Sequence, residues 1–301
     1  MSNRVVLVTG ARGFIGSSLL AAAQERGGSP QLIGVDIEDA DLRDRSAVDQ
    51  LLARVRPTRV VHLAATLAKG QDAAVLRAQR EHTFETGTVV IDAALAAGIH
   101  QILVPGSIDE FGGREGELAP SDPCEPRSYY GLCKSLLREH AAFRARTAPV
   151  RIDWFRPFIV YGPGQTQGGL LLPTLFRAAK NGERAQVSDG IQRRDFIHVA
   201  DVAAWILQAL TVPMGDASGS LLIHHLGTGE PVAVRTVIEA VAEEFPGSAF
   251  DIGAISRRPG EPLLQVSAPY ASADAELAAW RPRYQWRRGI AETAAWWKDG
   301  V

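Results

Sequence analysis

Short, uninterrupted apolar runs alternate with longer helical patterns through the first half of this chain. Polar residues do not break the runs, so each strand is expected to be buried on both faces, as in a parallel sheet covered by helices. Right-handed crossovers then predict an α/β fold with a doubly wound parallel sheet. The expected strands are Val5–Val8, Leu32–Val35, Val60–Leu63, Ile102–Val104 and Ile152–Phe155, and the expected helices, with apolar residues three and four apart, are Ile15–Arg26, Ser46–Val55, Thr86–Ala97 and Tyr130–Ala145.

The pattern changes after Tyr161. A stretch rich in glycine and proline, Gly162–Gly169, is typical of a loop. We predict that residues 1–163, with returning segments at about 191–228, form the main domain, and that residues 164–190 and 229–301 form a smaller C-terminal substrate-binding lobe. The elements expected in this half are helices at Leu172–Asn181, Val199–Leu210 and Val234–Glu244, and a strand at Leu221–Leu226.

Composition and charge narrow the classes of partner. The 301 residues carry a formal net charge of −2, with basic side chains scattered, so neither nucleic acid nor a membrane is an expected partner. Cys124 and Cys133 lack the spacing of a zinc site or a disulfide framework, and no metal is expected. No segment reaches the roughly 18 uninterrupted apolar residues of a membrane span, and the N-terminus shows no export signal. We expect a cytoplasmic protein.

A glycine-rich turn follows the first expected strand and opens the first expected helix. Its glycines are spaced G-x-x-G-x-x-G, which allows a tight turn, a close approach of backbone to phosphate, and close packing of helix on strand. The helix N-terminus offers unpaired N–H groups to a pyrophosphate. Strand and helix supply the context that confirms such a motif, so we predict a Rossmann-like dinucleotide-binding domain. The cofactor candidates here are Gly10, Arg12, Gly13, Phe14, Ile15 and Gly16.

Further cofactor contacts are expected at the ends of the next two strands. Asp36 lies about 20 residues after Gly16, where an acid binds the adenosine ribose hydroxyls and repels a 2′-phosphate. Arg12 could instead pair with that phosphate. NAD(H) is therefore favoured, and NADP(H) stays open. We also predict contacts of Asp41 and Leu42 with the adenine, and a turn beneath the dinucleotide formed by Leu63, Ala64 and Ala65.

Tyr130 and Lys134 are four residues apart on one face of an expected helix. A tyrosine with a pKa near 10 is a poor base at neutral pH. A neighbouring ammonium and the positive nicotinamide ring stabilise the phenolate, and the lysine can also hold the nicotinamide ribose. The pair predicts proton transfer by Tyr130, with Lys134 in support.

TGxxGxxG followed by YxxxK resembles the extended short-chain dehydrogenase/reductase superfamily, in particular its nucleotide-sugar epimerases, dehydratases and 4-ketoreductases. The resemblance covers nearly the whole chain. It implies that Ser107 hydrogen-bonds the reacting sugar oxygen, and that Arg194 and Arg258 reach the diphosphate of a nucleotide-diphosphate sugar. It also implies a homodimer formed through the helices at 86–97 and 130–145.

The resemblance leaves the reaction open. Ile108 and Asp109 stand where dehydratases carry Asp-Glu, which disfavours dehydration, and the short connection from Asp36 to Asp41 resembles 4-ketoreductases. Our first hypothesis is therefore reduction of a 4-keto-6-deoxy nucleotide sugar, with Tyr130 as proton donor. The alternative is a nucleotide-sugar 4-epimerase with tightly held NAD. A lesser alternative is a non-catalytic dinucleotide-sensing protein.

Overall fold

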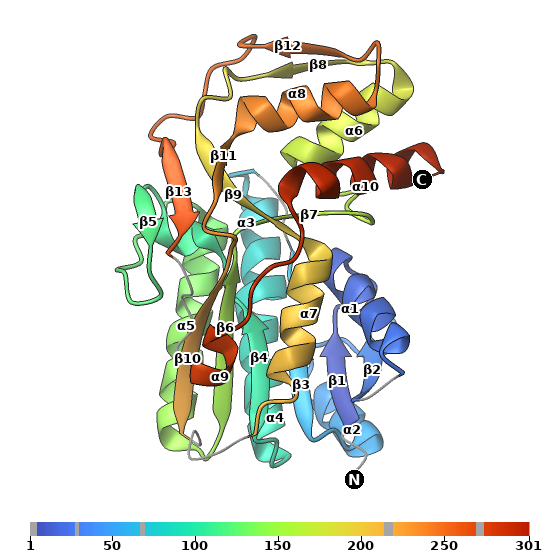
Figure 1. Cartoon of the computed structure of the whole chain (residues 1–301). Coiled ribbons are helices and arrows are strands. Elements are labelled where there is room, and N and C mark those ends of the chain that lie inside the picture. Colours follow the sequence, from blue (N-terminus) through green and yellow to red (C-terminus); the bar gives the residue numbers. More distant parts are fainter. Residues whose placement is uncertain (1–4, 28–29, 67–69, 214–218, 269–273, 301) are drawn as a thin grey trace.

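A six-stranded parallel sheet forms the centre of the computed structural model, which describes residues 5–27, 30–66, 70–213, 219–268 and 274–300 (Figure 1). The spatial order is β10-β6-β4-β3-β1-β2, and every neighbouring pair is parallel. This order confirms the predicted α/β fold with a doubly wound sheet. The strands are β1 (Val5–Thr9), β2 (Gln31–Val35), β3 (Arg59–His62), β4 (Gln101–Pro105), β6 (Arg151–Pro157) and β10 (Ser220–Leu226).

Helices cover both faces of this sheet, as its uninterrupted apolar strands require. Successive side chains of a strand point to opposite faces. In β1, Leu7 accordingly packs in the core beneath α2 (Arg45–Val55), α4 (Thr86–Ala96) and α5 (Tyr129–Thr147). Val6 and Val8 pack in a second core beneath α1 (Phe14–Glu25) and α7 (Val199–Ala209).

The smaller lobe stands at one end of the sheet (Figure 1). Its three helices surround a separate apolar core, which Tyr161, Phe196 and Trp297 enter. The helices are α6 (Leu171–Asn181), α8 (Val234–Glu244) and α10 (Trp286–Lys298), and the parallel pair β8 (Arg184–Val187) and β12 (Ala249–Ile252) runs beside them. Helix α10 was absent from the elements expected from sequence.

A second, smaller sheet links segments that are far apart in the chain. Its order is β11 (Pro231–Ala233), β9 (Arg193–His198), β13 (Leu264–Ser267) and β5 (Gly116–Leu118), and β7 (Ile159–Tyr161) pairs with β9. Asp195 of β9 fastens this sheet to the loop after β10, because its carboxylate accepts hydrogen bonds from the Thr228 and Gly229 N–H groups at 2.8 and 3.0 Å. The division into residues 1–163 with 191–228, and 164–190 with 229–301, stays a prediction.

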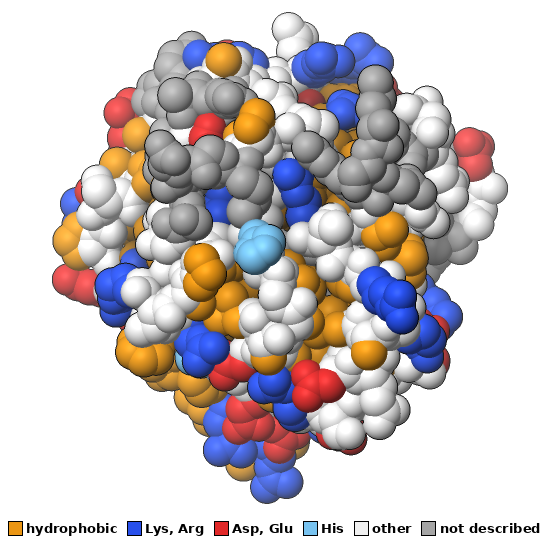
Figure 2. All heavy atoms as spheres, turned by 90° about the horizontal axis from the view of Figure 1, so that it is seen from below, with side chains coloured by type: hydrophobic (Ala, Val, Ile, Leu, Met, Phe, Trp, Pro, Cys, Tyr) orange, Lys and Arg blue, Asp and Glu red, His pale blue; other side chains and the backbone are white. Residues whose placement is uncertain are grey.

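The remaining short elements are α3 (Ala73–Gln79), a π-helix at Arg80–Glu85, a 3₁₀ helix at Ile108–Phe111 and α9 (Ala275–Ala278). Within the described ranges, no helix combines the length and the apolar character needed to span a bilayer. On the face seen from below, the coloured side chains show basic and acidic groups interspersed (Figure 2). Met1–Arg4, part of the segment in which no export signal was found, lie outside the described residues.

Candidate functional site

The glycine turn between β1 and α1 has the shape that a pyrophosphate requires. Gly10 has φ of +68°, and a Cβ added there would lie 2.7 Å from the backbone nitrogen of Ala64. A Cβ at Gly16 would overlap the Gly10 carbonyl oxygen. Gly13 is the N-cap of α1, and as a glycine it has no side chain to cap that N-terminus. The turn therefore presents backbone and a positive helix end, which fits the diphosphate of a dinucleotide.

Acidic groups surround Arg12 beside this turn. The Arg12 N–H donates to Asp36 Oδ2 at 2.8 Å, and its guanidinium Nη1 lies 3.1 Å from Glu38 Oε2. Asp36 thereby joins the glycine turn to the end of β2. Glu38 was not singled out from sequence, and it engages the positive charge that would otherwise attract a 2′-phosphate.

Asp41 and Leu42 differ in their surroundings. Asp41 accepts two hydrogen bonds from the Arg43 guanidinium, at 2.7 and 2.9 Å, and these bonds lower the pKa of its carboxyl to about 2. Leu42 is buried in the core beneath α2. Ala64 lies against Gly10, and Ala65 is exposed.

The ends of β1 and β3 are joined by a buried polar pair beneath the predicted dinucleotide site. Thr9 Oγ1 lies 2.8 Å from His62 Nδ1. Burial lowers the pKa of His62 to about 3, and the charge of Lys134 contributes to this lowering, so the imidazole is neutral at physiological pH. Thr9 is the threonine of the TGxxGxxG motif, but its contact with His62 was not predicted, because the two residues lie 53 positions apart in the chain.

Tyr130 and Lys134 both project from the first turns of α5. Ser128 caps the helix, because its Oγ accepts a hydrogen bond from Gly131 N at 3.0 Å. The Lys134 ammonium is buried 5.7 Å from the centre of the Tyr130 ring, and it donates to the Pro105 carbonyl at 2.8 Å. Because Pro105 ends β4 two residues before Ser107, this bond brings Lys134 to the strand that carries the predicted serine.

Burial shifts both titratable groups of this pair towards their neutral forms. It raises the pKa of the Tyr130 phenol well above its ordinary value, and the charges of Asp109 and Glu110 raise it further. It also lowers the pKa of Lys134 to about 8, against the opposing charge of Glu110. The phenol is thus protonated at neutral pH and can donate a proton, and it needs an added positive charge nearby before it can accept one.

Ser107 sits in extended backbone directly after β4. Its Oγ accepts a hydrogen bond from Asp109 N at 3.1 Å, which leaves the hydroxyl hydrogen able to donate elsewhere. The 3₁₀ helix that follows packs on the start of α5, since a Cβ at Gly131 would overlap the Asp109 carbonyl. Through this contact the structure brings Ser107, Tyr130 and Lys134 to the same end of the sheet.

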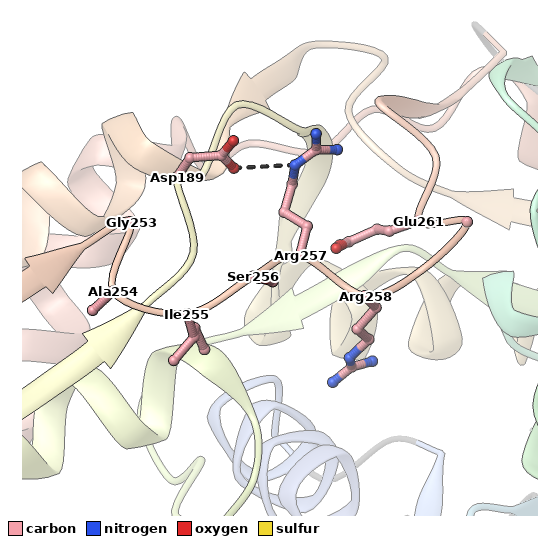
Figure 3. A pocket seen from close by; sticks show the side chains of 9 residues that line it. Asp189, Gly253, Ala254, Ile255, Ser256, Arg257, Arg258 and Glu261 are labelled. Carbon is pink, nitrogen blue, oxygen red and sulfur yellow. Dashed lines mark ion pairs between the residues drawn. The ribbon is translucent and has the colours of Figure 1, made fainter.

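A hollow of about 520 Å³ lies in the second lobe (Figure 3). It is lined by Asp189, residues 253–258, Gly260 and Glu261. Arg257 Nε lies 3.2 Å from Asp189, and the Arg258 side chain points to the other side of the loop. Arg194 does not line the hollow, but its Nη2 lies 3.0 Å from Glu261 Oε1. Both predicted phosphate-binding arginines thus lie at one region, and Glu261 is a residue that the sequence analysis missed.

Three comparisons place this geometry among known proteins. The sequence profile described as NAD dependent epimerase/dehydratase family matches residues 6–222. UDP-glucose 4-epimerase of Rhizobium meliloti (strain 1021) is 25% identical over 329 residues, covering 99% of this chain and 98% of that protein. The structure of Thermus thermophilus UDP-glucose 4-epimerase in complex with NAD matches with a TM-score of 0.82 at 24% identity, over 99% of this chain and 100% of that one. MoeE5 in complex with UDP-glucuronic acid and NAD matches with a TM-score of 0.83 at 27% identity, over 97% and 98%.

These matches bear on four earlier predictions. The structural likenesses confirm the α/β fold, and the family description confirms that NAD is the favoured cofactor. The match to a family of enzymes supports catalysis over dinucleotide sensing. The relatives support the 4-epimerase alternative rather than the 4-keto reduction that we put first, which the comparisons leave unconfirmed.

Proposed function

Because this chain belongs to the NAD dependent epimerase/dehydratase family, we propose that it is a nucleotide-sugar 4-epimerase with NAD as cofactor and a UDP-hexose as substrate. The observation that carries the proposal is the likeness to 4-epimerases over almost the full length of both chains. Membership of the family agrees with the resemblance seen in the sequence. The short connection after β2 favoured a reductase, but that connection contains none of the three residues proposed to act at the reacting carbon.

The proposed roles at the reacting carbon follow from the donors and acceptors of three side chains. Bound NAD would take up hydride from sugar C4 and return it. Tyr130 would accept the C4 hydroxyl proton and give it back, with the Lys134 ammonium stabilising the phenolate. Ser107 would donate its hydroxyl hydrogen to the same sugar oxygen, because its own Oγ already accepts from Asp109 N. This set serves reduction equally well, so these residues do not distinguish the two reactions.

The proposed cofactor site is the cradle formed by the glycine turn and the ends of β2 and β3. The candidates Gly10, Gly13 and Gly16, with Phe14 and Ile15, would surround the pyrophosphate at the uncapped end of α1. Asp36 would bind the adenosine ribose. Asp36 accepts a hydrogen bond from the Arg12 backbone N–H, and Glu38 lies beside the Arg12 guanidinium. Both carboxylates would repel a 2′-phosphate, which supports NAD(H) over NADP(H).

The proposed diphosphate site lies at the mouth of the second lobe. Arg258 lines the hollow, and Arg194 is held beside it by Glu261. A diphosphate would compete with Glu261 for the Arg194 guanidinium, since phosphate oxygens make similar charge-assisted hydrogen bonds. The proposed division places the cofactor in residues 1–163 with 191–228. The nucleotide sugar would lie between these residues, which supply Ser107, Tyr130 and Arg194, and the lobe of residues 164–190 and 229–301, which supplies Arg258.

Homodimer formation and a cytoplasmic location are the remaining proposals. Leu132, Leu136 and Phe143 lie on α5 and are 39%, 45% and 53% exposed. Large apolar groups at this spacing on a solvent face of a helix are typical of a surface that pairs with another chain. A dimer through α4 and α5 would cover them. The free thiols of Cys124 and Cys133 agree with a reducing compartment.

The test is to incubate the purified protein with UDP-galactose or UDP-glucose, without added reductant, and to separate the products. Interconversion of the two sugars without net change in NADH absorbance is expected, and denaturation should release about one NAD per chain. A protein that is purified free of nucleotide and consumes NADH with a 4-keto-6-deoxy nucleotide sugar would refute the proposal in favour of the reductase.

A further inference from the structure

The carboxylate of Glu110 is fully buried beside the backbone of Ser107. Its Oε1 accepts hydrogen bonds from the Ser107 N–H at 2.9 Å and from Trp154 Nε1 at 3.1 Å. Its Oε2 lies 3.0 Å from Arg156 Nη2 and 3.2 Å from Arg138 Nε. One side chain therefore joins the backbone of the predicted serine to β6 and α5.

The partners of Glu110 are themselves held in place. Arg156 is fully buried, its Nη1 donates to the Pro120 carbonyl at 3.2 Å, and its guanidinium lies 4.7 Å from the centre of the Phe111 ring. A Cβ on Gly106 would overlap Trp154 Nε1, so the chain before Ser107 passes close to this cluster only because that residue is glycine. The carboxylate is thus clamped from several elements.

A buried ion pair of this kind is a weak source of stability. Removing two charges from water costs more than their attraction commonly returns, and an apolar replacement of similar volume is often as stable. Ser107 N–H, Trp154 Nε1 and Arg156 Nη2 are all hydrogen-bond donors, and the two oxygens of the Glu110 carboxylate accept from them. Unlike apolar packing, the Glu110 carboxylate fixes the orientation of the Ser107 backbone.

We propose that Glu110 is a positioning residue, which aims the Ser107 hydroxyl at the substrate by holding the Ser107 N–H. Since Ser107 Oγ is also bound to Asp109 N, the direction of the hydroxyl is set by the backbone between these residues. Glu110 anchors the first end of that backbone segment. The inference rests on the proposed role of Ser107 in 4-epimerisation.

The experiment is a double-mutant cycle between Glu110→Gln and Ser107→Ala, measured as kcat and KM for UDP-galactose. In the glutamine variant the side-chain NH₂ must face hydrogen-bond donors in either orientation: Ser107 N–H and Trp154 Nε1, or the two arginines. Either orientation weakens the hydrogen bonding that positions the Ser107 backbone. We expect kcat to fall by about 10- to 100-fold, the loss typical of a misplaced catalytic group, with KM and NAD content close to wild type. In the Ser107→Ala background the same substitution should have no further effect on kcat.

Glu139→Gln is the matched control, because Glu139 also pairs with Arg138, at 2.9 Å, but its side chain is exposed at the surface. It should leave kcat within about twofold of wild type, as expected for a surface pair. If Glu110→Gln fails to fold, Arg138→Met keeps the carboxylate while removing one partner. A smaller loss of kcat is then expected, which Ser107→Ala should again abolish.

Two results would overturn the inference while the proposed function stands. One is a wild-type kcat in the Glu110→Gln enzyme. The other is a double variant whose fold loss of kcat equals the product of the losses in Glu110→Gln and Ser107→Ala. If Ser107→Ala alone leaves kcat unchanged, the proposed role of Ser107 is refuted, and the positioning role of Glu110 falls with it.

Discussion

Comparing the wild type with Lys134→Met should show how much one buried ammonium contributes to the pH dependence of the free energy of unfolding. The ammonium is almost completely buried, and burial lowers its pKa from 10.5 to about 8. At pH 7 the lysine is protonated in both folded and unfolded chains, so the folded protein bears the full cost of the buried charge. Between about pH 8 and 10.5 the folded chain loses this proton while the unfolded chain keeps it. The free energy of unfolding contributed by Lys134 therefore rises with pH.

The size of the effect follows from the shift. A difference of about 2.5 pKa units corresponds to about 3 kcal/mol over the whole range, and about 2 kcal/mol of this lies between pH 7 and pH 9.5. Stopping at pH 9.5 keeps the titration of tyrosines small. The methionine variant lacks the titrating group, so the wild type should gain about 2 kcal/mol relative to it across this interval.

The assay is urea unfolding of nucleotide-free protein, followed by tryptophan fluorescence at both pH values. Lys298→Met is the matched control, since its ammonium is at the surface, 3.5 Å from Glu244, and its stability should change with pH as the wild type does. A difference between wild type and Lys134→Met that stays constant within about 0.5 kcal/mol would refute the buried, charged state of Lys134.

Three further substitutions test the proposed site. Tyr130→Phe should lower kcat by about 10²- to 10⁴-fold with NAD content unchanged, because the proton-transferring group is lost, and near-normal turnover would end that assignment. Asp36→Ala should narrow the preference for NAD over NADP when the two nucleotides are titrated into nucleotide-free protein, and an unchanged ratio of dissociation constants would refute its role. Arg258→Met should raise KM for UDP-galactose about 10-fold with kcat little changed, whereas an unchanged KM would remove Arg258 from the diphosphate site.

The catalytic residues do not explain why reduction was ranked above epimerisation. In the proposed mechanism, Tyr130 would transfer the same proton in both reactions, with Lys134 and Ser107 in support. What differs is whether NADH leaves after each turnover, and that depends on contacts around the whole cofactor. The short connection between Asp36 and Asp41 was therefore a weak guide, and likeness over the full chain to 4-epimerases favours the alternative.

Local features of the sequence were sufficient for much of the candidate site. The G-x-x-G-x-x-G turn and the Tyr130–Lys134 pair depend on backbone conformation and on spacing within one helix, both of which follow from neighbouring residues. Ser107 was found only through family resemblance, because a serine after a strand has no distinctive local pattern. The Ser-x-x-Glu spacing to Glu110 was a capping-box signal that sequence analysis could have used.

The sequence by itself determined the parallel sheet, the glycine cradle and the tyrosine–lysine pair, since apolar period, glycine spacing and helical spacing act over a few residues. Only the tertiary structure decided which distant side chains meet. Arg194 pairs with Glu261 across 67 residues, and Arg156 pairs with Glu110 across 46. The sequence alone does not show which of its many arginines and acidic residues pair with one another. Packing of the strands and lobes decides which arginine pairs with which acid. Once buried, a charged side chain can pair only with groups that the fold places within hydrogen-bonding distance.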